Sequence, residues 1–180
     1  VYTGAHGPAN GLDQVLDTAG NVQADLPDAQ FLLVGDGVDK PALVDAAEQR
    51  NLSNVRFLDP IPKAEIPQLL AAADIGLHVL ADVPLFRYGV SPNKLFDYMA
   101  AGLPVVTNCP GEVEETVSAA GAGIAVPPDE LERAVRTAAQ VSPDQLENWG
   151  EGGRRFIERY RSRQVIATQL DAMLNRVVGP

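Results

Sequence analysis

The chain has 180 residues, of which 46% are hydrophobic and 21% are charged, the composition of a folded globular protein. At roughly 100 to 200 residues per domain, this length allows one sizeable domain or two small ones. The formal net charge of −10 disfavours contact with a phosphate backbone and argues against a general nucleic-acid role. A single cysteine, Cys109, excludes an intramolecular disulfide and a multi-cysteine metal site, and two histidines, His6 and His78, exclude a histidine-rich one.

The first residues, Val1-Tyr2-Thr3, have the pattern of a strand that runs directly into Gly4. No charged segment followed by an apolar one opens the chain, and no apolar run approaches the ~18 residues of a membrane-spanning helix. We therefore expect neither a secretory signal nor a membrane span in this sequence. Because the chain begins inside a strand, we expect it to be one domain of a longer protein.

A glycine-rich loop and an amphipathic helix follow the first strand. The apolar residues of this helix recur at the i, i+3, i+4, i+7 spacing of one buried stripe. They are Leu12, Val15, Leu16, Ala19 and Val22. Residues 31–34 then form an unbroken apolar run that ends at Gly35-Asp36-Gly37. Unbroken runs are typical of strands that are covered on both faces, as in parallel sheets.

Strand-like and helix-like segments alternate along the rest of the chain. Strands are expected at 55–58, 75–80, 103–106 and 123–126, and helices at 41–50, 64–73, 92–101, 129–140 and within 143–178. This order predicts an α/β fold, a doubly wound, Rossmann-like parallel sheet of about six strands with helices on both faces. Ligands of such sheets bind beyond the carboxyl ends of the strands. The candidate loops are 4–11, 35–40, 59–63, 80–94 and 107–113.

Between residues 64 and 132 the chain has ten acidic residues and only two basic ones, Arg87 and Lys94. Both flank a predicted helix start, where Ser91 is a good N-cap and Pro92 a good first residue. Lys94 then lies in the first turn, where the helix dipole makes a cation unfavourable by about 0.3–1 kcal/mol unless an anion binds there. Two interpretations stay open: a phosphate site at Ser91 to Lys94 with Arg87, or an ion pair between Lys94 and Asp97 on one helix face.

Other polar residues also allow two interpretations. Asp97 could accept hydrogen bonds from a vicinal diol such as ribose, or it could be solvated. The loop Gly4 to Gly11 lets a ligand approach the backbone, but it lacks the G-x-G-x-x-G dinucleotide fingerprint. His6 in this loop either faces a ligand or is an ordinary loop histidine. His78 and Cys109 are expected to be packed core residues.

Residues 91–106, Ser-Pro-Asn-Lys-Leu-Phe-Asp-Tyr-Met-Ala-Ala-Gly-Leu-Pro-Val-Val, resemble the signature of retaining GT-B glycosyltransferases of the large group-one family (family four). With residues 84–87 they resemble its N-acetylfucosamine transferase branch, and the segments 31–37, 54–58 and 120–128 resemble other strands of that family in order and spacing. The resemblance covers most of the chain and corresponds to the carboxyl-terminal, nucleotide-sugar-binding half. It implies a Rossmann-like domain at 1–148 and a helical tail at 149–180, which packs on this domain and toward an amino-terminal domain.

The resemblance also implies roles for particular residues. Asp97 corresponds to the ribose-binding acid, Ser91 to Lys94 to the phosphate-binding helix start, and Asp59 to Ile61 to a loop that contacts the base through backbone groups. The binding residues of the implied donor site are Gly4, His6, Gly7, Ile61, Ser91, Pro92, Asn93, Lys94, Leu95 and Asp97. We expect no metal ligand among them.

Some positions depart from the family pattern. Gly89 replaces a glutamate that contacts the donor sugar, and Ala5 and Asn10 replace an arginine and a lysine that contact the diphosphate. We therefore expect Arg87 and Lys94 to supply the positive charge. They would act catalytically by stabilising the departing diphosphate as its charge develops, with no obligatory cofactor or metal.

The function implied is that of the donor-binding domain of a cytoplasmic glycosyltransferase. It would transfer a sugar with retention from a nucleoside diphosphate sugar, UDP-linked by expectation, to a sugar or lipid-linked acceptor held by the amino-terminal domain. This chain alone is expected to bind nucleotide and to transfer little or no sugar. Two alternatives stay open: a GT-B nucleotide-sugar epimerase, and a non-enzymatic doubly wound binding domain.

The tail differs in charge from the rest of the chain. Residues 149–180 have six arginines and three acids, whereas the first 148 residues have a net charge of −13. The apolar residues of the tail form a helical stripe: Val165, Ile166, Leu170, Met173, Leu174 and Val177. We expect this stripe to dock on the domain or in part on the amino-terminal domain. Peripheral contact with the inner, anionic face of a membrane is a weaker alternative.

Overall fold

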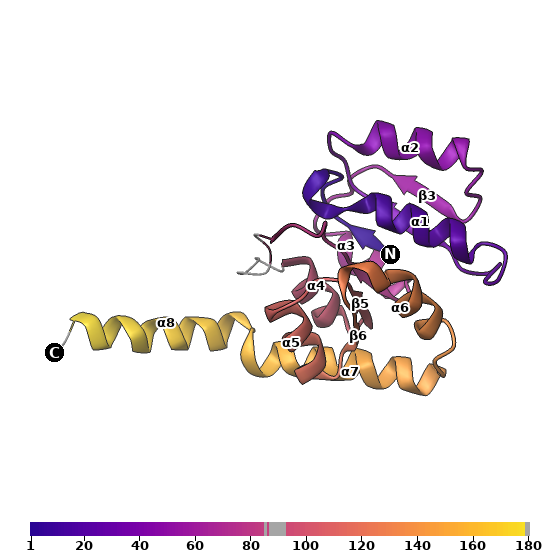
Figure 1. Ribbon diagram of the computed structural model, residues 1–180. Coiled ribbons are helices and arrows are strands. Elements are labelled where there is room, and N and C mark those ends of the chain that lie inside the picture. The colour runs from indigo at the N-terminus through magenta and orange to yellow at the C-terminus, as the bar shows by residue number, and fades with distance from the viewer. Residues whose placement is uncertain (85, 87–92, 179–180) are drawn as a thin grey trace.

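The computed structural model describes residues 1–84, 86 and 93–178. In this part of the chain, short strands alternate with helices as the sequence predicts (Figure 1). The strands are β1 (Tyr2–Thr3), β2 (Phe31–Val34), β3 (Val55–Leu58), β4 (Gly76–His78), β5 (Val105–Thr107) and β6 (Gly123–Ala125). The fold is therefore α/β, with the expected six strands in the described residues.

The strands run parallel in two three-stranded sheets, ordered β1-β2-β3 and β4-β5-β6. Val1 joins the two sheets, because its nitrogen donates to the carbonyl of Ile75 at 2.6 Å and its carbonyl accepts from the nitrogen of Leu77 at 2.7 Å. The strands therefore follow one another as β3-β2-β1-β4-β5-β6. In this order the chain changes direction between β1 and β4, which is where doubly wound sheets have a crevice for ligands.

Two apolar clusters lie against the strands, one for each group of helices. The first cluster unites α1 (Leu12–Val22), α2 (Lys40–Gln49) and α6 (Leu131–Ala138), and the second unites α3 (Ile66–Ala71), α4 (Asn93–Ala101), α5 (Glu112–Ala120) and α7 (Pro143–Tyr160). Two short 3₁₀ helices, Pro8–Asn10 and Pro128–Glu130, precede α1 and α6. The prediction of a doubly wound fold with helices on both faces is confirmed.

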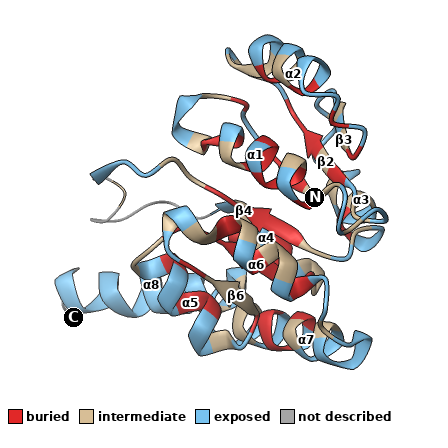
Figure 2. Cartoon of the chain, turned by 45° about the vertical axis from the view of Figure 1, so that its right-hand side comes forward, coloured by how far each residue is buried: buried red, intermediate tan, exposed pale blue. Residues whose placement is uncertain are grey.

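The strand β5 shows how the two clusters share the sheet. Val105 belongs to the second cluster and its neighbour Val106 to the first, and both are almost fully buried. Successive side chains of a strand point to opposite faces, so covering both faces buries every residue of the strand. The predicted stripe of α1 is also confirmed, because all five of its residues belong to the first cluster (Figure 2).

No helix is expected from the sequence between β5 and β6, yet α5 lies there. Its first turn has three acidic residues, Glu112, Glu114 and Glu115, which complement the positive end of the helix dipole. Val113 and Val117 are fully buried on one face, four positions apart. Gly121 ends the helix in the left-handed conformation with φ of 58°. These acids, the paired valines and the terminal glycine are the signals that would have predicted the helix.

The helix α7 packs closely on α4. A Cβ atom on Gly153 would lie 3.3 Å from Met99, so glycine allows the two helices to approach. Ser142 caps α7 by accepting a hydrogen bond from the nitrogen of Gln145, and the helix continues without interruption through residues 148 and 149.

The last helix, α8 (Arg163–Val178), extends away from the other elements (Figure 1). Apart from Val165, which is of intermediate burial, its apolar stripe is exposed, with exposed fractions from 44% for Ile166 to 80% for Val177. The expected docking of this stripe on the same domain is therefore not observed. None of the described helices is both long and apolar enough to cross a bilayer.

Candidate functional site

A hollow of about 320 Å³ lies where the first three strands end. Three of its walls come from the loops after β1, β2 and β3, which meet because parallel strands have their carboxyl ends at one edge. The lining residues are Thr3, Gly4, Ala5, Val34, Gly35, Asp36, Pro60, Ile61 and Ile66. The structure thus brings together three of the five loops that the sequence indicates, and it places the predicted binding residues Gly4 and Ile61 in the wall.

The loops after β1 and β2 approach each other closely because both contain glycine. Gly35 has a φ of 146°, and a Cβ atom built on it would collide with the carbonyl oxygen of Gly4. Main-chain hydrogen bonds hold the pair, from Gly4 N to Val34 O at 2.9 Å and from His6 N to Asp36 O at 2.8 Å. The shape of this wall therefore depends on glycine at position 35.

Lys94 lies at the start of α4, and its side chain extends to β1 and to the loop that follows β1. Its Nζ donates to the hydroxyl of Tyr2 at 3.0 Å and to Oδ1 of Asn10 at 2.9 Å. The same Nζ lies 4.2 Å from the centroid of the Tyr2 ring, a cation–π contact. A Cβ atom on Gly4 would lie 3.6 Å from Nζ, so the ammonium group adjoins the wall of the hollow.

These contacts bear on one of the two interpretations of Lys94, the ion pair with Asp97, and the phosphate site stays a prediction. The predicted ion pair with Asp97 is wrong, because the ammonium group binds Tyr2 and Asn10 instead. Burial lowers the pKa of Lys94 to about 8. Among the described residues, the hydrogen-bond partners of this partly buried cation are two neutral oxygen atoms, an environment that favours an added anion.

The other predicted residues of α4 take different positions. Asn93 and Asp97 are exposed, with Asp97 one turn beyond the start of the helix. The side chain of Leu95 is fully buried in the second cluster, so only its main-chain amide is available to a ligand. The amides of a first helical turn have no partner within the helix. Arg87, Ser91 and Pro92 lie outside the described residues, as does Gly89.

The structure places His6 beneath the loops. The side chain is fully buried between the rings of Tyr2 and Phe57, at centroid distances of 5.9 and 6.1 Å, and it does not line the hollow. Neither ring nitrogen has a hydrogen-bond partner among the described residues. Burial, followed by the charge of Lys40, lowers the pKa of His6. The structure thus shows His6 packed between two rings, and its contact with a ligand stays a prediction.

Gly7 follows His6 and has an extended backbone, with φ of −137° and ψ of 170°. A Cβ atom built on it would meet nothing within 4 Å. It accepts a main-chain hydrogen bond from the nitrogen of Asn10 at 2.9 Å. The structure thus leaves open space beside Gly7, at the start of the 3₁₀ helix that leads to Asn10.

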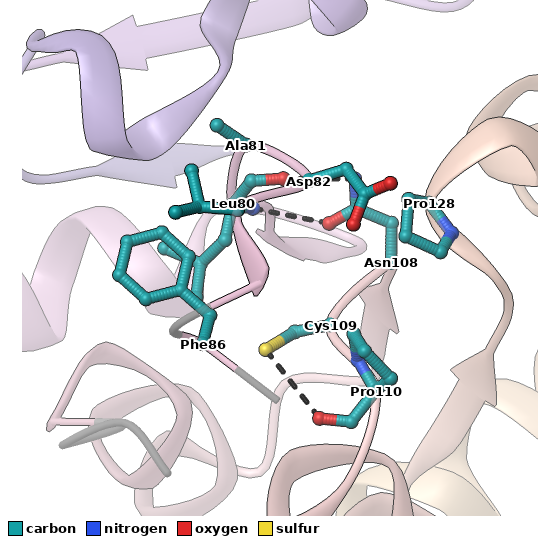
Figure 3. A pocket seen from close by; sticks show the side chains of 9 residues that line it. Leu80, Ala81, Asp82, Phe86, Asn108, Cys109, Pro110 and Pro128 are labelled. Carbon is teal, nitrogen blue, oxygen red and sulfur yellow. Dashed lines mark hydrogen bonds between the residues drawn. The ribbon is translucent and has the colours of Figure 1, made fainter. Parts of the chain in front are cut away.

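Asn108, after β5, holds the beginning of the segment that leads to α4. Its Oδ1 accepts from the nitrogen of Leu80 at 3.0 Å (Figure 3). Its Nδ2 donates to the carbonyl of Leu80 at 3.2 Å and to Gln14 at 2.9 Å. The next residue, Ala81, donates from its nitrogen to the carbonyl of Ala9 at 3.1 Å. The segment is therefore tied to the loop that contains Asn10.

His78 and Cys109 are packed residues, as the sequence predicts. Nδ1 of His78 lies 3.1 Å from Oγ1 of Thr107, which accepts a hydrogen bond from the nitrogen of Cys109. Burial, followed by the charge of Lys94, lowers the pKa of His78 to about 3. Burial raises the pKa of Cys109 to about 11, so its thiol is a poor nucleophile at neutral pH.

Two residues near the hollow are missed by the sequence analysis. Tyr2 is fully buried, donates to the carbonyl of Ala5 at 2.7 Å and accepts from Lys94. Lys40, at the start of α2, binds the carbonyl oxygens of Gly35 and Leu58. Like Lys94, it is a lysine in the first turn of a helix, and this unfavourable position is the signal that could have indicated it.

The sequence and the fold were compared with those of known proteins. The family model for glycosyl transferases group 1 matches residues 1–142. The chain belongs to the group 1 glycosyl transferases. This family, together with its structural relatives, confirms a GT-B glycosyltransferase fold, as the resemblance of residues 91–106 implies.

Three relatives of this glycosyltransferase domain have informative names. A GDP-mannose-dependent monoacylated alpha-(1-6)-phosphatidylinositol monomannoside mannosyltransferase of Corynebacterium glutamicum is 28% identical over 173 residues, which are 93% of this chain and 44% of the relative. Anabaena Alr3699/HepE, crystallised with UDP, has a TM-score of 0.78 at 22% identity, covering 97% of this chain and 48% of that one. The C-terminal domain of a group 1 glycosyl transferase, LpcC of Francisella tularensis, has a TM-score of 0.72 at 18% identity, covering 90% and 85%.

The glycosyltransferase domain thus spans less than half the length of the curated relative and most of the isolated C-terminal domain. The family match does not favour the epimerase or the non-enzymatic alternative. The N-acetylfucosamine branch and the retention of configuration stay predictions.

Proposed function

We propose that this chain is the donor-binding half of a retaining glycosyltransferase that uses a nucleoside diphosphate sugar, with UDP as the preferred nucleotide. The observation that carries the proposal is the position of the Lys94 ammonium group, between the start of α4 and Asn10 and beside the wall of the hollow. The resemblance puts the family's diphosphate-binding lysine at position 10. Lys94 therefore brings a cation to that loop from another helix.

In the proposed complex the nucleobase occupies the hollow and contacts Ile61 and the backbone of the loop after β2. The diphosphate lies at the start of α4, where the amides of Asn93 to Leu95 and the ammonium group of Lys94 bind anionic oxygen atoms. Asp97 accepts hydrogen bonds from the ribose hydroxyls. The crystallisation of HepE with UDP supports the choice of nucleotide, although the Corynebacterium relative is named for GDP-mannose.

The proposed chemistry is substitution at the anomeric carbon of the donor sugar. The bond from this carbon to the diphosphate oxygen breaks, the electron pair stays on the diphosphate, and a new bond forms to an acceptor oxygen that loses its proton. Negative charge develops on the leaving oxygen, and Lys94, with Arg87, stabilises it. This stabilisation raises the rate of transfer only to the extent that the two cations bind the departing diphosphate more tightly than they bind the intact donor.

The acceptor, a sugar or a lipid-linked group, is proposed to bind a separate amino-terminal domain. The length of the curated relative, of which this chain covers 44%, supports such a domain. We propose that the exposed stripe of α8 packs against it and that the enzyme acts in the cytoplasm. The alternative to test is that the arginine-rich tail contacts an anionic membrane surface, which would then cover the stripe.

Calorimetry of this chain with UDP, GDP and ADP tests the nucleotide site. We expect UDP to bind most tightly and Lys94→Ala to weaken its binding at least tenfold. Arg155→Ala, which removes a cation paired with Glu151 on the exposed face of α7, is the matched control and is expected to bind like the wild type. Equal binding of UDP by the wild type and Lys94→Ala, or no binding of any nucleotide, contradicts the proposal.

Hydrogen exchange tests the position of α8. We expect residues 166–177 to exchange quickly in this chain and slowly in the longer natural protein, because an amino-terminal domain covers the stripe. Protection that requires anionic vesicles would indicate membrane contact instead. An intact natural protein with the mass of this chain alone would refute the amino-terminal domain.

A further inference from the structure

The two loops that face each other across the hollow, residues 35–39 after β2 and 59–63 after β3, must keep a fixed separation if a flat base is to bind between them. A main-chain hydrogen bond from Gly35 N to Leu58 O, 3.1 Å long, joins the first residue of one loop to the last residue of β3, just before the other. Beyond this bond both loops line the hollow, through Asp36 of one and Ile61 of the other. A side chain that binds both loops would therefore control the width of the hollow.

Lys40 makes this connection. Its Nζ donates to the carbonyl of Gly35 at 2.9 Å, to the carbonyl of Leu58 at 3.1 Å and to Oδ1 of Asp59 at 2.8 Å. An ammonium group has three donors, and all three are used. The contacts thus fix the side chain at once to Gly35, the residue just after β2, and to Leu58 and Asp59, the residues just before and just after the end of β3.

The environment of Lys40 shows which of its contacts matter. The side chain of Lys40 is 15% exposed, whereas that of Asp59 is 96% exposed. An ion pair with so exposed a carboxylate contributes little, because water and salt screen it. The carbonyl oxygens of Gly35, a buried residue just after β2, and of Leu58, the last residue of β3, are therefore the partners whose loss would change the loops.

Lys40 also lies at the first residue of α2, where the helix dipole is unfavourable to a cation. Helix stability does not explain a lysine at this position. Lys94 occupies the equivalent unfavourable position in α4 and turns toward the loop after β1. Lys40 thus contacts the loops after β2 and β3, whereas Lys94 contacts the loop after β1, and all three loops line the same hollow.

We propose that Lys40 is a positioning residue for the nucleobase, which sets the width of the hollow by binding the loops after β2 and β3 and does not itself touch the ligand. The proposal rests on the proposed function. Its consequence is selective, because loss of Lys40 releases the base end of the site and leaves Lys94 and the start of α4 unchanged. Binding of UDP should weaken, whereas binding of a diphosphate without a base should not.

The test uses this chain and two probes, UDP and inorganic pyrophosphate, each titrated by NMR chemical shift. In Lys40→Met we expect UDP to bind at least tenfold more weakly and pyrophosphate to bind within twofold of the wild type. Lys40→Arg should recover part of the affinity for UDP. Arg50→Met is the matched control, because it removes a cation from the other end of α2, where it pairs with Asp17.

Several outcomes would overturn the assignment. Wild-type affinity for UDP in Lys40→Met would show that the loops do not depend on the lysine, and equal loss of both probes would indicate a general structural effect. Hydrogen exchange without ligand is a second measurement. In Lys40→Met we expect faster exchange that is confined to the two loops. Unchanged exchange counts against the proposal that Lys40 holds the loops together. If the wild type binds neither probe while the loops do loosen, the nucleotide function fails and the role toward the base fails with it.

Discussion

The Nζ atom of Lys94 lies 2.9 Å from Oδ1 of Asn10, a residue 84 positions earlier in the chain. The contact connects the first turn of α4 with the loop after β1 across the point where the sheet order reverses. It puts positive charge next to Gly4 in a protein whose net charge is −10. Burial of the ammonium group lowers the pKa of Lys94, which costs folding stability. The same burial would strengthen the attraction between the ammonium group and a bound anion, so stability and binding are linked.

Replacing Lys94 with methionine should stabilise the folded chain at pH 7. In the folded state the pKa of Lys94 is about 8 instead of 10.5, so the protonated side chain costs free energy at every pH below 8. After allowance for the lost hydrogen bonds to Tyr2 and Asn10, we expect the free energy of unfolding to rise by about 1 kcal/mol. Urea denaturation at pH 7 measures it. A less stable variant would show that the hydrogen bonds outweigh the desolvation.

Binding of UDP should be coupled to proton uptake above neutral pH. A bound diphosphate favours the protonated form of Lys94 and raises its pKa above the value of about 8 in the free chain. Affinity should therefore be constant near pH 7 and fall as the pH rises through 8, with about half a proton taken up at pH 8. Calorimetry in two buffers that differ in ionisation enthalpy measures the uptake. Lys94→Met should show none, and equal affinities at pH 7 and pH 9.5 in the wild type would disprove the coupling.

The sequence predicts those features that depend on residues close together in the chain. The buried stripe of α1 follows from the spacing of five apolar residues, and the strand–helix alternation gives the doubly wound fold. The partners of Lys94 cannot be predicted in this way, because Tyr2 and Asn10 lie 92 and 84 positions away and meet it only through the order of the strands. Local spacing favours Asp97 instead.

His6 and Lys40 illustrate the same limit at the hollow. A histidine in a glycine-rich loop is expected to be accessible, but the loop after β2 covers His6 and leaves its ring fully buried. Lys40 binds Gly35, five positions earlier, but also Leu58 at the end of the next strand, 18 positions later. In both cases at least one contact, from Leu58 to Lys40 and from Phe57 to His6, comes from another strand, whose position is decided by the whole sheet.

The chain should lose stability in mild acid, in part because of His78. Burial and the charge of Lys94 lower the pKa of His78 to about 3 in the folded state, against 6.5 when unfolded. The unfolded state therefore binds the proton first, and stability falls as the pH decreases from 6.5 toward 3. Between pH 7 and pH 5 the contribution of His78 is about 2 kcal/mol. Urea denaturation at both pH values measures the loss.

The matched variant for this effect is His78→Asn, whose amide can replace Nδ1 as the hydrogen-bonding partner of the Thr107 hydroxyl. Its stability should fall less between pH 7 and pH 5 than that of the wild type. Some pH dependence should remain, because burial also lowers the pKa of His6. An identical loss in the variant and the wild type would assign the acid sensitivity to other groups.

Alanine at two glycines near the hollow should have opposite effects. Gly35 has a φ of 146°, and its added Cβ would collide with the carbonyl oxygen of Gly4, whereas Gly7 has an extended backbone and open space around it. We expect Gly35→Ala to reduce the free energy of unfolding by about 2 kcal/mol or more and to weaken UDP binding, because the two loops must separate. Gly7→Ala should leave stability unchanged or raise it by up to about 1 kcal/mol, because alanine restricts the unfolded chain. Urea denaturation of both variants provides the comparison, and equal stability of the two would mean that the close approach of Gly4 and Gly35 is not required by the fold.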